Sequence, residues 1–190
     1  MMRWSLGLAT LPGMDPRTDL ARRIYGAAYI TGTFKLRSGA TSHEYFDKYL
    51  FATEPKLLAD IGKALAALVP PDIEVLAGLE MGAIPLVTMI AQNTGHPTVF
   101  VRKKAKEYGT YKLAEGAAID GRRVLVIEDV VTSGGQVVLS TADLRAQGAI
   151  IDRALCVIDR QSGGREKLAE IGVALTALYD MTELKAAGAA

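Results

Sequence analysis

Two adjacent carboxylates followed by a small, hydroxyl-bearing turn are the side chains of this sequence best suited to chemistry. They lie in VLVIEDVVTSGG, Val124–Gly135, where Glu128 and Asp129 end a run of branched apolar residues. Thr132, Ser133 and two glycines follow, and a helix is predicted to begin directly after them. Backbone N–H groups at a helix start are unpaired and partly positive, so this turn is predicted to cradle a phosphate group.

The acid pair narrows the choice of ligand. Carboxylates directly beside a phosphate would repel it, whereas one residue farther back they can accept hydrogen bonds from ribose hydroxyls. The segment lacks the Gly-Lys-Ser/Thr of a Walker loop and the Gly-x-Gly-x-x-Gly of a dinucleotide-binding turn. The combination therefore predicts a ribose 5-phosphate site.

A second charged segment, VRKKAKEYGTYKLAEG at 101–116, carries Arg102, Lys103, Lys104 and Lys106. Most charge runs of this kind are solvated surface. This one leaves a predicted strand and enters a loop with glycine and tyrosine but no apolar periodicity. We expect a mobile basic lid that clamps a diphosphate as the diphosphate gains charge on leaving.

Composition excludes several other classes of protein. The chain has 190 residues, 49% of them hydrophobic, and 22 Lys+Arg against 21 Asp+Glu for a net charge of +1. This balance argues against general binding of nucleic acid, which usually requires a basic excess. The one cysteine, Cys156, excludes a disulfide framework within the chain, is predicted to be a core residue and fits a cytoplasmic protein. No run is long and apolar enough to span a membrane.

The elements that must position these residues alternate between helix and strand. Periodicity predicts helices at 17–29, 54–69, 84–95, 136–148 and 164–172. A short strand pair is predicted at 32–39 and 43–51, and further strands at 73–78, 98–103, 122–129, 151–159 and 173–181. Strands that are apolar on both faces and separated by helices predict an α/β fold with a mainly parallel sheet flanked by helices.

Three polar, glycine-bearing loops are predicted to meet at one edge of this sheet. They follow the strands at 73–78, 122–129 and 151–159 and read LEMG, VVTSGG and DRQSGG. Ligands of open parallel sheets bind beyond the carboxyl ends of the strands, so we expect the site there.

The string VLVIEDVVTSGG resembles the phosphoribosyl diphosphate (PRPP) signature of the type I phosphoribosyltransferases, which is a highly specific motif. Four further segments resemble the orotate phosphoribosyltransferases within that group: FKLRSGATSHEYFD, GLEMGAIPL, VRKKAKEYGTYKLAEG and CVIDRQSGG. The resemblance covers roughly 19–184. It implies the type I fold with a small N-terminal hood, and a PRPP site over Glu128, Asp129, Val130, Val131, Thr132, Ser133, Gly134 and Gly135.

The resemblance also assigns roles in the lid. Lys106 would stand against the reacting diphosphate, and Arg102 and Lys103 would bind diphosphate oxygens. Tyr108 replaces a histidine that many members carry and is counted with the PRPP-binding residues. The implied catalytic residues are Lys106, Lys103, Arg102 and Asp129. The loop GLEMGAIPL lacks a lysine that some members have, since Met81 and Gly82 stand there.

Orotate is an acid with two ring carbonyls, so its pocket needs cations and an apolar or aromatic wall. By the resemblance, Arg160 would grip orotate and Arg37 would stand where many relatives have lysine. Tyr45 and Phe46 are expected as a stacking wall, and Thr132 is expected to contact the base as well.

The resemblance implies an enzyme of de novo pyrimidine (UMP) biosynthesis that converts orotate and PRPP to orotidine 5′-monophosphate and diphosphate. Mg²⁺ would enter bound through PRPP, with no metal ligands from the protein. The enzyme would be a cytoplasmic homodimer whose lid reaches into the neighbouring subunit. Two alternatives are a phosphoribosyltransferase for another base and a PRPP-sensing regulator without catalysis.

The expected domain organisation is simple. Residues 1–18 are interpreted as an N-terminal extension, and the part before Met14 is interpreted either as an extension from an upstream start codon or as a disordered tail. Residues 19–185 form the phosphoribosyltransferase domain, with a hood from about 19–50 plus the C-terminal segment. Residues 186–190 form a tail.

Overall fold

The computed structural model describes residues 13–35, 39, 41–104 and 113–189. Its centre is a six-stranded sheet of β3 (Val75–Leu79), β4 (Thr98–Val101), β5 (Ala114–Gly116), β6 (Val124–Val131), β7 (Arg153–Asp159) and β8 (Ala174–Asp180). The strands lie in the order β5-β4-β3-β6-β7-β8, and every pair is parallel except β4 with β5. The mainly parallel sheet is therefore as predicted, while the short antiparallel edge strand β5 was not expected.

The strand order places a topological switch point between β3 and β6. From β3 the chain proceeds to β4 on one side, and it later returns to β6 on the other side of β3. In open α/β sheets such a point leaves a crevice beyond the carboxyl ends of the two strands. The LEMG and VVTSGG segments both begin there.

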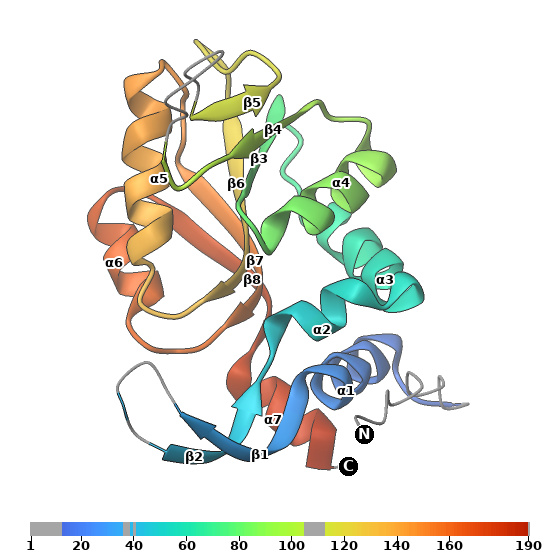
Figure 1. Cartoon of the computed structure of the whole chain (residues 1–190). Coiled ribbons are helices and arrows are strands. Elements are labelled where there is room, and N and C mark those ends of the chain that lie inside the picture. The colour runs from blue at the N-terminus through green and yellow to red at the C-terminus, as the bar shows by residue number, and fades with distance from the viewer. Residues whose placement is uncertain (1–12, 36–38, 40, 105–112, 190) are drawn as a thin grey trace.

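Helices cover both faces of the sheet (Figure 1). α3 (Pro55–Ala66) and α4 (Ala83–Thr94) pack on one face, where their side chains join a core with Leu76, Leu125 and Ile127. α5 (Gly135–Ala146) and α6 (Gly164–Glu170) pack on the other face. The core there includes Cys156, whose side chain is buried as predicted.

Both ends of the described chain meet in one subassembly at the lower end of Figure 1. It consists of α1 (Pro16–Ala28), the antiparallel pair β1 (Tyr29–Lys35) and β2 (Thr41–Phe46), α2 (Lys48–Thr53) and α7 (Met181–Ala189). The Tyr179 hydroxyl donates to the Arg17 carbonyl at 2.7 Å, and Arg17 pairs with Glu183 at 2.8 Å. A Cβ at Gly188 would lie 2.1 Å from the Tyr25 ring, so α1 and α7 pack closely at that glycine.

The structure differs from the sequence prediction in this subassembly. The predicted strand at 43–51 ends at Phe46, and α2 begins at Lys48, because the Asp47 side chain accepts from the Tyr49 N–H at 3.0 Å and caps the helix. Residues 16–18, assigned to the extension, already belong to α1, which Asp15 caps. Residues up to Ala189, assigned to a tail, continue α7. Within the described residues, no helix has both the length and the apolar character to cross a membrane.

Candidate functional site

A cavity of about 400 Å³ opens at the switch point beyond β3 and β6. Its wall combines the turn after β6, the turn after β3, the base of the 101–116 segment and the start of α2. The lining residues are Lys48, Tyr49, Glu80, Met81, Lys103, Glu128, Val130, Val131, Thr132, Ser133, Gly134, Gly135, Gln136 and Val137.

The predicted phosphate cradle forms one part of this wall. Gly134 has a φ of 70°, a left-handed conformation that glycine adopts without strain, and α5 begins at the next residue. Thr132 and Ser133 are exposed, so their hydroxyls are available to a ligand. Backbone N–H groups at a helix start lack intrahelical acceptors, so this wall of the cavity presents the donor types that an anion site requires.

The start of α6 supports the cradle from behind. A Cβ at Gly164 would lie 2.5 Å from Val131 Cγ1 and 2.6 Å from the Thr132 carbonyl oxygen. Gly164 therefore has to lack a side chain for the cradle to pack against α6. Gly164 ends the DRQSGG segment, and no role was predicted for it from the sequence.

The two adjacent carboxylates are both buried, but only Glu128 lines the cavity. Glu128 lines the cavity, whereas Asp129 is 1% exposed and continues the row of Leu125 and Ile127 that faces α3 and α4. The Asp129 N–H donates to Glu128 Oε1 at 2.9 Å. Burial, and after it the neighbouring Asp129 carboxylate, raise the pKa of Glu128 well above its ordinary value. Glu128 therefore holds its proton to a higher pH than an exposed glutamate would.

The Asp129 carboxylate is held by two hydrogen-bond donors and by close packing against Gly82. Its Oδ1 accepts from Lys48 Nζ at 2.8 Å and from the Val130 N–H at 2.6 Å. Its Oδ2 is buried and accepts no hydrogen bond from the described residues. A Cβ at Gly82 would lie only 1.6 Å from Oδ2, so the carboxylate occupies the space that a side chain at residue 82 would fill.

Lys48 is the main site residue that the sequence analysis missed. Burial opposes its charge, but the hydrogen bond and charge of Asp129, together with the charge of Glu128, outweigh burial and raise the pKa of Lys48. The Asp47 cap could have indicated a helix beginning at Lys48. No local signal indicates that this lysine reaches a carboxylate 81 residues away.

The β3 turn and the base of the predicted lid form the opposite wall. Glu80 Oε1 accepts from the Lys103 N–H at 2.6 Å, which ties the two segments together. Lys103 lines the cavity as expected, and Arg102 lies beside it at the end of β4 without lining the cavity. Lys106 and Tyr108 lie outside the described residues. Glu80 was not predicted as a site residue.

Most of the predicted base-binding residues are not brought into this cavity. Tyr45 is 44% exposed and its ring packs on Phe34, with centroids 5.4 Å apart, while Phe46 packs against Tyr25. Arg160 is exposed at the end of β7, where its N–H donates to the Val131 carbonyl at 2.8 Å. Only Thr132 of this group lines the cavity, and Arg37 lies outside the described residues.

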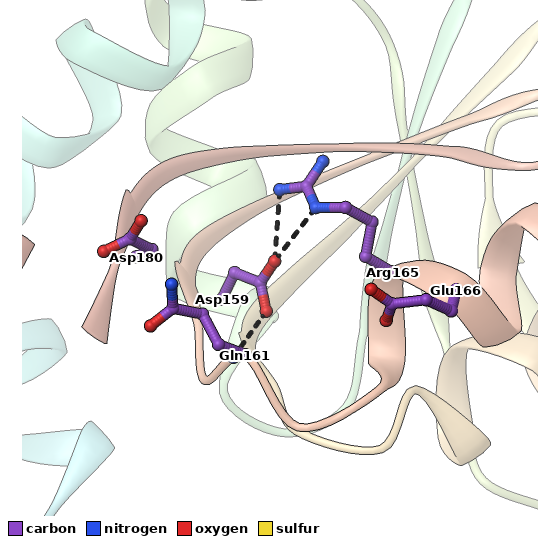
Figure 2. Close-up of a pocket in the computed structure, with 5 residues that line it drawn as sticks. All are labelled: Asp159, Gln161, Arg165, Glu166 and Asp180. Carbon is purple, nitrogen blue, oxygen red and sulfur yellow. Dashed lines mark hydrogen bonds and ion pairs between the residues drawn. The ribbon is translucent and has the colours of Figure 1, made fainter. Parts of the chain in front are cut away.

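A second pocket, of about 270 Å³, lies beyond β7 and β8 and is lined by Asp159, Gln161, Arg165, Glu166 and Asp180. Figure 2 shows that Arg165 pairs with Asp159, through Nε at 3.2 Å and Nη2 at 3.1 Å, while Asp159 Oδ1 accepts from the Gln161 N–H at 2.8 Å. Asp159 therefore fixes the loop that carries Arg160. No group of three or more His, Cys, Asp or Glu side chains in the described part of the chain is arranged to hold a metal ion.

Comparison with known proteins agrees with this geometry. Residues 52–178 match the model of the phosphoribosyl transferase domain family. The chain is 48% identical over 168 residues to an orotate phosphoribosyltransferase of Nocardioides sp.. The aligned region covers 88% of this chain and 94% of the relative.

Solved structures of Mycobacterium tuberculosis orotate phosphoribosyltransferase share the fold. The complex with Fe(III) dicitrate matches with a TM-score of 0.81 and 29% identity, over 90% of this chain and 99% of the other. The complex with PRPP matches with a TM-score of 0.78 and 26% identity, over 90% and 99% of the two chains.

Proposed function

The chain belongs to the phosphoribosyl transferase domain family, and we propose that it is the orotate phosphoribosyltransferase of pyrimidine biosynthesis. It is a pentosyltransferase that makes orotidine 5′-monophosphate and diphosphate from orotate and PRPP. The observation that carries this conclusion is the cavity at the β3–β6 switch point, which joins a phosphate cradle to a buried acid pair. The choice of orotate as the acceptor base rests on relatives that match most of the chain and are named orotate phosphoribosyltransferases.

We infer one orientation for PRPP in the cavity from the residues that line it. The 5-phosphate lies on the cradle of residues 132–135, and the ribose hydroxyls face Glu128 at the cavity wall, beside the buried Asp129. The diphosphate then points to the opposite wall, where Lys103 and the backbone after β3 line the cavity. Because the family lysine of that loop is replaced by Met81 and Gly82, the cations that meet the diphosphate come from the lid segment.

In the reaction, a ring nitrogen of orotate forms a bond to the anomeric carbon as the bond from that carbon to diphosphate breaks. The configuration inverts, and the nitrogen's proton leaves to solvent. Positive charge develops on the ribose and negative charge on the leaving group. Lys106, with Arg102 and Lys103, offsets the negative charge, and a closed lid excludes the water that would hydrolyse PRPP.

The orotate subsite draws on residues outside the cavity. In this proposal Arg160, held beside the cradle by its backbone bond to Val131, grips the acid group of orotate. Arg37 adds a second cation, Tyr45 and Phe46 form the aromatic wall, and Thr132 contacts the base. Tyr45 and Phe46 lie on β2 of the hood, made of α1, β1, β2, α2 and α7, which meets the cavity through Lys48 of α2.

Mg²⁺ is the implied cofactor, and the donor set fits an ion that arrives on PRPP. The ion would be held by PRPP oxygens and water, and Glu80 of the cavity wall offers hard carboxylate oxygens that suit the water shell of a hydrated Mg²⁺. When bound, the ion would offset negative charge on the diphosphate. A homodimer with the lid shared across its interface, and a cytoplasmic location, are further proposals that rest on the family resemblance.

The test is turnover of PRPP with a panel of bases. We expect diphosphate release with orotate and none with adenine, hypoxanthine or uracil at matched concentrations. Diphosphate release with another base, and none with orotate, would show that the protein is a phosphoribosyltransferase for that other base. Binding of PRPP without turnover of any base would support a sensor instead.

A further inference from the structure

The contact between Lys48 and Asp129 joins α2 of the hood to β6, the strand that carries Glu128 and Asp129. Lys48 is the first residue of α2, and its Nζ lies 2.8 Å from Asp129 Oδ1. The Lys48 side chain is 37% exposed and lines the cavity, whereas that of Asp129 is 1% exposed. The lysine therefore stands between the ligand space and the buried carboxylate.

The Lys48 ammonium compensates the charge of the buried Asp129 carboxylate. A buried carboxylate is strongly disfavoured unless a cation or several donors compensate it. The titratable groups that face Asp129 and Lys48 are Glu128 of β6, a second acid, and Tyr49 of α2, while α4 presents the Gly82 backbone. Lys48 supplies the compensating cation of this group, and its charge also favours ionised Glu128.

The contacts of the Asp129 carboxylate also fix its orientation. Lys48 Nζ and the Val130 N–H hold the same oxygen of Asp129, and the close approach of Gly82 limits where the other oxygen can go. The carboxylate is therefore held in one place before any ligand arrives. Lys48, Glu128 and Val130 form the cavity wall beside it, which is where the ribose of PRPP lies in the proposed function.

We propose that Lys48 is a positioning residue for PRPP, which acts by holding the Asp129 carboxylate, and with it the adjacent Glu128 of β6, in place for the ribose hydroxyls. This inference rests on the proposed function. It also predicts that the position of α2 and the rest of the hood relative to β6 sets the affinity for PRPP.

The first experiment compares PRPP affinity of wild type, Lys48→Met, Lys48→Arg and Lys63→Met by calorimetry from pH 5.5 to 8.5. Lys63→Met is the matched control, since Lys63 is an exposed lysine of neighbouring α3. We expect Lys48→Met to weaken binding about 10- to 100-fold, the range for a lost charge-assisted hydrogen bond. The loss should grow towards acid pH, because without the ammonium the pKa of Glu128 rises further.

Lys48→Arg should restore most of the affinity and the wild-type pH profile, and kcat at saturating PRPP should change less than KM. Lys63→Met should match wild type. A Lys48→Met loss that is the same at every pH and is not restored by arginine would overturn the proposal, because Lys48 would then only pack α2. Affinity equal to the control would overturn it as well.

A second experiment needs neither substrate. Lys48→Met leaves Asp129 buried without its cation, so Lys48→Met/Asp129→Asn should be more stable to urea than Lys48→Met alone. Equal or lower stability of the double variant would overturn the charge argument. If wild type fails to bind PRPP while this rescue is seen, the proposed function fails and the Lys48–Asp129 coupling stands.

Discussion

Gly82→Ala tests the placement of the buried carboxylate most directly. The new Cβ would lie 1.6 Å from Asp129 Oδ2 and 2.5 Å from its Cγ. Non-bonded heavy atoms are favourably separated by about 3.5–4.0 Å, so the carboxylate has to move by about 2 Å. The backbone itself is not strained, since Gly82 has φ −69° and ψ −27°, a conformation that alanine adopts readily.

Such a movement breaks the bonds of Asp129 to Lys48 Nζ and to the Val130 N–H. A hydrogen bond to a charged group contributes about 1.5–3 kcal/mol, so loss of the two bonds in Gly82→Ala should lower the free energy of unfolding by about 3–6 kcal/mol. If ribose binding needs the same geometry, PRPP affinity should fall about 10- to 100-fold. Urea unfolding and calorimetric titration with PRPP measure the two effects.

The control places the same substitution where the clash is absent. In an Asp129→Ala background there is no carboxylate to displace, and only the Cβ of residue 129 stays close, at 3.2 Å, so Gly82→Ala should lower the free energy of unfolding by less than about 1 kcal/mol. Equal destabilisation by Gly82→Ala in both backgrounds would refute the reasoning, because the cost would then arise elsewhere. Unchanged stability and affinity in the first background would do the same.

Three further predictions concern the rest of the site. Because the pKa of Glu128 is raised on folding, its contribution to stability is present below about its ordinary value of 4.5 and is lost as pH rises through the folded pKa. Glu128→Gln should therefore gain stability relative to wild type as pH increases, and a difference in urea unfolding that does not vary with pH would contradict this. Arg160→Ala should raise KM for orotate with little change in PRPP affinity, whereas equal damage to both in steady-state kinetics would assign Arg160 to the fold. If the lid is shared in a homodimer, mixing Lys106→Ala with Asp129→Asn chains should restore towards half of wild-type activity per heterodimer; no recovery despite subunit exchange, checked by mass spectrometry, would place lid and cradle in one chain.

Local sequence was sufficient for the sheet and the cradle. Runs such as Val124–Ile127 are apolar on both faces, which only a sheet covered on both sides can bury. The turn at Thr132–Gly135 combines hydroxyls, glycines and a helix start in one continuous segment, so its conformation could be predicted locally. The structure places this turn in the cavity wall, and its binding of PRPP stays a prediction.

Local sequence misled where two structures compete for one segment. The residues HEYFDKYLF are rich in aromatic side chains and favour a strand, and the prediction of a strand at 43–51 followed that preference. Asp47 instead caps a helix, which buries Phe51 and Ala52 against the core. Burial of the Phe51 side chain is a tertiary gain, which propensity alone does not contain.

Tertiary structure alone decided which groups surround the acid pair. Lys48, Gly82 and Asp129 lie on α2, at the start of α4 and on β6, and they meet only because β3 and β6 are neighbours and α2 leads into α3 beside them. The sequence determines that Glu128 and Asp129 end a buried strand. The fold determines that Asp129 is buried against a glycine and paired with a lysine, because charge compensation depends on distance in space and not along the chain.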